Sequence, residues 1–212
     1  FGTAVLVSET FLRTKIDLAI NSGIDIYPGG TLMEIAYQQQ EDIQYINWVK
    51  NLGFSMIEIS DGIFNIDRKK RCDTIKRSKD AGLKVITEVG KKDSEVEIPI
   101  SQICEDIILD LDHGAEKVII EGRESGKNIG VYDNKGNILD KKVKSILEGI
   151  NHRQNDIIWE APQQHQQASF IQRFGSNVNL GNILPRDILG LEALRQGLRY
   201  ETLVHFVSEN KL

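Results

Sequence analysis

Short apolar runs that end in glycine, proline or acidic residues alternate with helix-like segments along nearly the whole chain. Six runs have the composition of β-strands, and their starts lie roughly 20 to 40 residues apart, about the length of one βα unit. These runs cover residues 23–27, 55–59, 83–89, 117–120, 156–159 and 177–180. Regular βα alternation predicts a parallel sheet with helices packed outside it.

The segments between these runs have helical periodicity, which predicts helices over residues 41–51, 69–81 and 100–113. Gly53, Gly82 and Gly114 each follow one of them, where a left-handed C-terminal cap favours glycine.

Residues 1–6 resemble the end of a further strand, and one more strand before residue 1 would complete eight. We therefore expect an α/β fold of the (β/α)8 TIM-barrel type. It would form a single domain over residues 1–212, with the N-terminal first strand absent from this chain. An open doubly wound sheet is less favoured, because fewer of its strand ends would surround a ligand.

Composition narrows the class of protein. A chain of 212 residues, 40% hydrophobic and 27% charged, fits one globular domain. The net charge of -5 argues against a general nucleic-acid binder, and no apolar stretch approaches the roughly 18 to 20 residues of a membrane span. Cys72 and Cys104 are expected to be free thiols, at least half-buried, in a reducing cytoplasm. We accordingly expect a cytoplasmic protein without nucleic-acid or membrane partners.

A glutamate stands at or just past the end of four expected strands, at Glu58, Glu88, Glu121 and Glu160. The carboxyl ends of parallel strands face one side, so these side chains and the nearby cations would converge on one pocket. Because gathered carboxylates repel one another, a metal ion, a shared proton or an anionic substrate paired with cations has to hold them there.

Polar residues after further strands extend the expected pocket. Gly29-Gly30-Thr31 either presents backbone N–H groups to an anion, or forms a turn in which Thr31 caps a helix and Glu34 completes a capping box. Asn179 and Asn182 either help to hold a phosphate or bond neighbouring strand ends. Residues 132–137 predict the tip of a hairpin.

Together these segments resemble the phosphosulfolactate synthase family. The motifs that carry the resemblance are Tyr-Pro-Gly-Gly-Thr-Leu at 27–32, Glu-Ile-Ser-Asp-Gly at 58–62, Thr-Glu-Val-Gly-Lys-Lys at 87–92, Glu-Gly-Arg-Glu-Ser-Gly at 121–126, Glu-Ala-Pro at 160–162 and Val-Asn-Leu-Gly-Asn-Ile at 178–183. Residues 191–199 resemble the family's closing helix, and residues 1–3 resemble the end of a second-strand motif whose lysine would precede residue 1. The chain departs from the family at Gly181, where an alanine is familiar.

The resemblance implies a Mg²⁺-dependent barrel enzyme, a carbon–sulfur lyase, that adds sulfite to phosphoenolpyruvate. The product is (2R)-2-O-phospho-3-sulfolactate, at the first step of a coenzyme M or sulfolactate route. Sulfite attacks the methylene carbon, negative charge develops on the carboxylate, and a general acid protonates the carbon that bears the phosphate. Phosphoenolpyruvate and sulfite are then the small-molecule partners, and a homo-oligomer is a further expectation.

The roles of individual residues are hypotheses carried by these motifs. Lys91 is the expected acid, and Lys92 is expected to turn outward. The catalytic candidates are Lys91, Glu121 and Arg123, the last as a clamp for phosphate or sulfonate unless it forms a surface pair. The candidate metal ligands are Glu58, Asp61, Glu88 and Glu160. The substrate-binding candidates are Gly30, Thr31, Arg123, Ser125, Asn179 and Asn182.

Two other interpretations stay open at this point. One is a non-catalytic, stress-protective barrel protein of the same family, against which the intact strand-end motifs argue. The other is a lyase that acts on phosphoenolpyruvate with another nucleophile, because nothing in the residues separates sulfite from a similar small anion.

Overall fold

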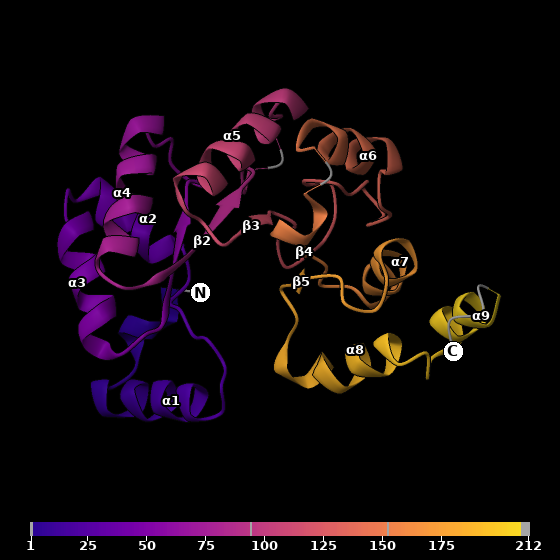
Figure 1. Ribbon diagram of the computed structural model, residues 1–212, viewed down its shortest axis with the longest axis horizontal. Coiled ribbons are helices and arrows are strands. Elements are labelled where there is room, and N and C mark those ends of the chain that lie inside the picture. The colour runs from indigo at the N-terminus through magenta and orange to yellow at the C-terminus, as the bar shows by residue number, and fades with distance from the viewer. Residues whose placement is uncertain (1, 94, 152, 209–212) are drawn as a thin grey trace. The chain divides into compact units, whose positions relative to one another are not determined.

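The computed structural model describes residues 2–93, 95–151 and 153–208, and Figure 1 labels its α-helices and strands β2 to β5. Its five strands have the sheet order β1-β2-β3-β4-β5, which is their order in the sequence, and β1 with β2 and β4 with β5 pair in parallel. The expected α/β class with a parallel sheet is therefore confirmed, and it is consistent with part of a (β/α)8 barrel.

The chain divides into two compact units, residues 1–118 and 119–212. That residues 1–212 form a single domain stays a prediction.

The first unit carries most of the helices that the sequence predicts. Its helices are η1 (Gly2–Leu6, a 3-10 helix), α1 (Glu9–Asn21), α2 (Thr31–Gln38), α3 (Asp42–Leu52), α4 (Arg68–Asp80) and α5 (Ile100–His113). Its strands are β1 (Met56–Ser60), β2 (Lys84–Val89) and the beginning of β3 (Lys117–Ile120). The bounds of α3, α4 and α5 agree within one residue with the predicted ranges.

Glycine ends these helices in the predicted way. Gly53, Gly82 and Gly114 have φ angles of 98°, 88° and 112°, in the left-handed region that glycine adopts without a steric penalty. Helix α4 packs on β1, β2 and α5 (Figure 1). The register of β1 and β2 places Ser60 opposite Glu88, so these two residues lie together at the carboxyl ends of the strands.

Two expected strands near the start of the chain are not strands. Residues 2–6 form η1 instead, and Phe1 lies outside the described residues. Residues 24–27 form neither a helix nor a strand, although the Met56 N–H donates to the Ile26 carbonyl at 3.2 Å. The Ile26 N–H, however, donates to Ser55 Oγ at 3.0 Å. A β-ladder needs backbone hydrogen bonds in both directions between two strands. Because the Ile26 N–H donates to a side chain instead, this segment does not continue the sheet.

The second unit contains the end of β3 and the rest of the elements. These are α6 (Asp140–Gly149), η2 (Gln154–Asp156), β4 (Ile157–Glu160), α7 (Gln164–Phe174), β5 (Leu180–Gly181), η3 (Pro185–Asp187), α8 (Ile188–Arg195) and α9 (Tyr200–Ser208). In its core Trp159 of β4 stacks on Phe170 and Phe174 of α7, with ring centroids 5.1 and 5.9 Å apart. This stack fixes α7 against the strand that ends in Glu160.

Two bounds in this unit differ from the predictions. β5 begins at Leu180 rather than at residue 177. The closing helix, expected over 191–199, ends at Arg195, because Gly197 adopts a φ of 67° that breaks the helix before α9. Leu198, part of the expected helix, is consequently 75% exposed.

The predicted hairpin tip is confirmed. Tyr132 and Ile138 form an antiparallel bridge. Between them the Asp133 carboxylate accepts hydrogen bonds from the Lys135 and Asn137 backbone N–H groups, both at 2.8 Å, as an aspartate in a tight turn does.

Two smaller expectations are also met by the described residues. Cys72 and Cys104 are buried free thiols. None of the helices in the described part of the chain has the length and apolar character that crossing a membrane requires.

Candidate functional site

The carboxyl ends of β1 and β2 carry a buried polar cluster. Ser60 and Glu88 are both buried, and Ser60 Oγ donates to Glu88 Oε1 at 2.8 Å. Lys92 Nζ donates to the same oxygen, also at 2.8 Å. Ser60 Oγ also lies 3.1 Å from Glu34 Oε1. A hydroxyl and an ammonium group thus fix one oxygen of the glutamate near the end of β2.

The capping box, one of the two alternatives left open for Thr31 and Glu34, does not form. Gly30 is the N-cap of α2, and no side chain among the described residues caps this helix. Glu34, completely buried, accepts instead from the backbone N–H groups of Ile63 at 2.7 Å and Phe64 at 2.9 Å. The carboxylate is engaged by residues far along the chain, so it does not turn back to its own helix.

The beginning of α2 lies directly over Glu58. A Cβ atom added at Gly30 would lie 2.5 Å from Glu58 Oε1 and 2.7 Å from Ser60 Cβ. Burial, and then the negative charge of Glu88, raise the pKa of Glu58 to about 8, while Lys92 and a hydrogen bond from the Gly30 backbone oppose the rise. The start of α2, one possible site for an external anion in the sequence analysis, is therefore in contact with the Glu58 carboxylate.

The two adjacent lysines after β2 have different partners. Lys92 contacts buried Glu88 and its side chain is 29% exposed, so the expectation that it turns outward is wrong. Lys91 Nζ donates to the Asp61 carbonyl and lies 3.4 Å from the Asp61 carboxylate and 3.5 Å from the Phe64 carbonyl. Lys91 also borders a cavity of about 370 Å³ that Asp61 and Arg71 help to line.

Arg71 of α4 holds the end of β2 from outside. Its guanidinium donates to both Asp110 carboxylate oxygens, at 2.8 and 2.5 Å, and to the Glu88 carbonyl at 3.0 Å. Burial by itself lowers the pKa of Arg71, but the Asp110 charge outweighs it and the pKa is raised. The buried ion pair therefore stays charged and fixes the backbone of the strand-end glutamate.

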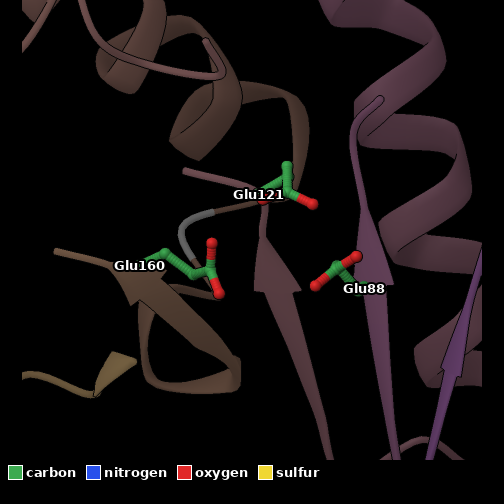
Figure 2. A group of neighbouring side chains, drawn as sticks. All are labelled: Glu88, Glu121 and Glu160. Atoms are coloured by element: carbon green, nitrogen blue, oxygen red, sulfur yellow. The ribbon is translucent and has the colours of Figure 1, made fainter. Parts of the chain in front are cut away.

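The second unit carries the next two strand-end glutamates. Glu121 directly follows β3 and Glu160 ends β4, and Figure 2 draws both together with Glu88 of the first unit. Glu121 and Glu160 offer carboxylate oxygens within 4.8 Å of one another. Glu160 Oε2 accepts from the backbone N–H groups of Gly122 at 2.8 Å and Arg123 at 3.0 Å, and Glu121 Oε1 accepts from Arg123 N–H at 2.7 Å. The loop after β3 thus orients both carboxylates through its backbone.

This loop has a constrained conformation. Arg123 adopts a φ of 55°, which is uncommon for a residue other than glycine, and its side chain is exposed. A Cβ atom at Gly122 would lie 2.9 Å from the Glu160 carbonyl oxygen. The Tyr132 hydroxyl donates to that same carbonyl, and burial raises the pKa of this phenol. The close approach allows Glu160 to meet the Gly122 and Arg123 N–H groups.

The remaining substrate-binding candidates lie in different places in the second unit. Asn182 follows β5 with a φ of 56°, at the carboxyl end of the strand that pairs with Glu160. The Asn179 side chain donates to the carbonyls of Asn155 at 2.9 Å and Ile157 at 3.1 Å, at the amino end of β4. Ser125 is exposed, and its carbonyl accepts from the Gln163 side chain at 2.5 Å. Asn182 therefore lies at the same end of the paired strands as Glu160, whereas Asn179 bonds the opposite strand end.

Three buried polar residues of this site were not among the sequence candidates. Ser60 could have been found from the sequence, because it follows Glu58 by two residues in the Glu-Ile-Ser-Asp-Gly segment. Arg71 and Asp110 lie in helices rich in charged residues, and no local pattern separates this buried pair from the exposed charges around it.

The model of the (2R)-phospho-3-sulfolactate synthase (ComA) family matches residues 1–201. The chain belongs to this family. The resemblance seen in the sequence motifs is thereby confirmed, and with it the assignment to a family of lyase-type enzymes with a TIM-barrel fold.

Curated relatives come from archaea and bacteria. The phosphosulfolactate synthase of Methanocaldococcus jannaschii is 43% identical over 95% of this chain and 80% of its own length. The phosphosulfolactate synthase of Methanothermobacter thermautotrophicus is 40% identical over 96% of this chain and 79% of its own. The phosphosulfolactate synthase of Bacillus subtilis is 36% identical over 95% of this chain and 79% of its own length.

Proposed function

We propose that this chain is a phosphosulfolactate synthase, which adds sulfite to phosphoenolpyruvate and gives (2R)-2-O-phospho-3-sulfolactate. The observation that carries the proposal is the family match over residues 1–201. Buried Glu88 and Glu121, half-buried Glu160 and the lysine that contacts Glu88 support it, because carboxylates and a cation are the groups that this chemistry needs. That the product enters a coenzyme M or sulfolactate route stays a prediction, as does a homo-oligomer.

We propose Mg²⁺ as the cofactor, with glutamate oxygens as ligands. Carboxylates are the protein groups that Mg²⁺ prefers, and Glu121 and Glu160 offer oxygens within 4.8 Å of one another. Backbone N–H groups orient both of them, as surrounding donors commonly orient metal ligands. When bound, Mg²⁺ would supply positive charge for the carboxylate that becomes an enediolate.

Further carboxylates are proposed as ligands from the first unit. Glu88 has one oxygen fixed by Ser60 and Lys92, and in a (β/α)8 barrel the carboxyl ends of the strands surround one active-site face. Glu58 and Asp61 are weaker candidates. Glu58 has a pKa raised to about 8, and Asp61 is paired with Lys91 and with Arg71. To bind a metal, Glu58 would have to release its proton, and Asp61 would have to leave its cationic partners.

The reaction requires one bond to sulfur and one proton. The sulfite lone pair forms a bond to the methylene carbon, and the electrons of the carbon–carbon double bond move to the substrate carboxylate. Collapse of this enediolate takes up a proton at the carbon that bears the phosphate. The Arg123 guanidinium is proposed as a clamp for phosphate or sulfonate, because its planar fork matches such oxyanions. Gly30, Thr31, Ser125 and Asn182 stay proposals for substrate contacts.

The contacts favour Lys92 over Lys91 as the proton donor. Lys92 donates to Glu88, one of the proposed metal ligands, so its ammonium group would be close to a substrate bound at that metal. The amine of Lys91 faces oxygen atoms of Asp61 and Phe64, in the connection after β1. Lys91, the sequence candidate, is therefore kept as the alternative donor.

A direct assay tests the proposed function. Phosphoenolpyruvate and sulfite are incubated with the purified protein, with and without Mg²⁺, and the product is followed by ³¹P NMR. A new phosphate-ester signal that needs both sulfite and metal is the expected result. Binding of phosphoenolpyruvate without product would favour another nucleophile, and a melting temperature unchanged by phosphoenolpyruvate would favour a non-catalytic protein.

A further inference from the structure

Glu34 is completely buried in the first unit, although burial of a carboxylate is costly unless its oxygen atoms are bonded. Two neutral N–H donors and a contact with the Ser60 hydroxyl, whose proton goes to Glu88, hold it. The Ile63 and Phe64 N–H groups donate to Oε2 at 2.7 and 2.9 Å, and Ser60 Oγ lies 3.1 Å from Oε1. All three contacting groups belong to residues 60–64, at the end of β1 and the start of its connection to α4. Glu34 thus anchors this segment to α2.

Residues 61 and 64 of the anchored segment contact Lys91. The Lys91 ammonium faces the Asp61 carbonyl and carboxylate and the Phe64 carbonyl. Phe64 therefore contacts Glu34 through its N–H and Lys91 through its carbonyl. A displacement of residues 61–64 would move the acceptors that place Lys91.

Ser60 of the same segment is connected to Lys92 through Glu88. Ser60 contacts both Glu34 and Glu88, and Glu88 Oε1 accepts from Lys92 at 2.8 Å. The Lys92 backbone N–H also donates to the Gly62 carbonyl at 2.9 Å, within the same anchored segment. Both lysines therefore depend on the segment that Glu34 holds.

We propose that Glu34 is a positioning residue, which fixes residues 60–64 and through them the ammonium groups of Lys91 and Lys92. Its effect on turnover rests on the proposed function, whereas its effect on lysine placement does not. Hydrogen bonding, rather than the negative charge, is the property that matters. In Glu34→Gln the amide oxygen can accept from the Ile63 and Phe64 N–H groups, and the amide NH₂ can face Ser60 Oγ. In Glu34→Ala all of these contacts are lost.

Kinetics of the two variants separate these roles. Glu34→Gln is expected to keep kcat within about threefold of the unmodified protein. Glu34→Ala is expected to lower kcat about 10²-fold, the effect of a displacement of roughly 1 Å at a catalytic group, with a smaller change in KM for phosphoenolpyruvate. Glu41→Ala is the matched control, since Glu41 is an exposed glutamate of the same unit.

A second measurement does not need catalysis. Reductive methylation, followed by mass spectrometry of the peptide with Lys91 and Lys92, reports how firmly the two amines are held. We expect labelling to be several-fold faster in Glu34→Ala and unchanged in Glu34→Gln and Glu41→Ala. If the protein has no synthase activity, this result still decides whether Glu34 places the lysines.

Two results would overturn the proposal. One is a Glu34→Ala protein that labels like the unmodified protein. The other is a folded Glu34→Gln protein that labels as fast as Glu34→Ala, which would make the charge decisive. If Glu34→Ala does not fold, Glu34→Asp takes its place, because its side chain is one methylene shorter and cannot keep all of these contacts. Unchanged labelling in Glu34→Asp would likewise count against the proposal.

Discussion

Replacement of Gly30 by alanine tests whether α2 must approach the strand ends as closely as the structure shows. Gly30 has a φ of -59°, so an alanine meets no backbone restriction there. The added Cβ atom would lie 2.7 Å from Ser60 Cβ and 2.5 Å from Glu58 Oε1. Ordinary contacts between carbon atoms are about 3.5 to 4.0 Å, so the helix start has to move by roughly 1 Å.

This displacement sets the expected magnitude. Ser60 belongs to β1 and is completely buried, so the helix has to yield rather than the strand. Overpacking of this kind costs about 1 to 3 kcal/mol. For a chain of this size each kcal/mol lowers Tm by about 2 to 4 °C. Turnover should fall about 10²-fold, because α2 carries Glu34, and a shift of this helix would displace the segment that Glu34 holds.

Thermal or urea unfolding and the ³¹P NMR assay measure the two effects. Gly190→Ala is the matched control, because Gly190 lies within α8 and its added Cβ atom would meet nothing within 4 Å. That variant should gain about 0.5 to 1 kcal/mol from the better helix propensity of alanine. A Gly30→Ala protein with unchanged Tm and turnover would show that the close approach is not required.

Three further predictions concern the charged groups of the first unit. Lys92→Ala should lower kcat at least about 10²-fold, the usual contribution of a general acid, and Lys91→Ala should lower it less; the reverse order would assign the proton to Lys91. Because burial raises the pKa of Glu58 from 4.5 to about 8, the folded chain keeps a proton that the unfolded chain releases. The free energy of unfolding should therefore decrease as pH rises from 4.5 to about 8, and urea titrations of Glu58→Gln should lack this decrease. Asp110→Ala should destabilise the fold by about 3 to 5 kcal/mol in the same urea titrations, because it removes the nearer and fully buried partner of the Arg71 charge and leaves only Asp61 at 3.4 Å; a loss below about 1 kcal/mol would contradict this.

Local patterns predicted the helices and their ends well. Gly53, Gly82 and Gly114 end helices because of a backbone conformation that glycine alone adopts easily, and this requires no knowledge of the rest of the fold. The parallel β1 and β2 were equally visible, as buried apolar runs. The segments at 2–6 and 23–27 were not, because a strand forms only where a neighbour supplies its hydrogen bonds.

The sequence predicted which residue types gather at the strand ends, but not which way their side chains point. The strand-end glutamates were visible because their spacing follows the βα period. Whether Lys91 or Lys92 turns towards Glu88 depends on residues far away in the sequence, so adjacent lysines cannot be told apart from the motif alone. Glu34 shows the same limit. The Thr-x-x-Glu spacing fits a local cap, yet its partners are Ser60, Ile63 and Phe64.

The hairpin at residues 132–138 has a consequence for engineering the protein. Surface turns usually tolerate inserted tags or domains. Here the Gln166 side chain of α7 donates to the carbonyls of Gly126 and Gly136, at 2.8 and 2.9 Å, and Tyr132 donates to the Glu160 carbonyl. An insertion at this turn would pull on the strand end that carries Glu160, so a reporter placed there would report on the state of the site itself.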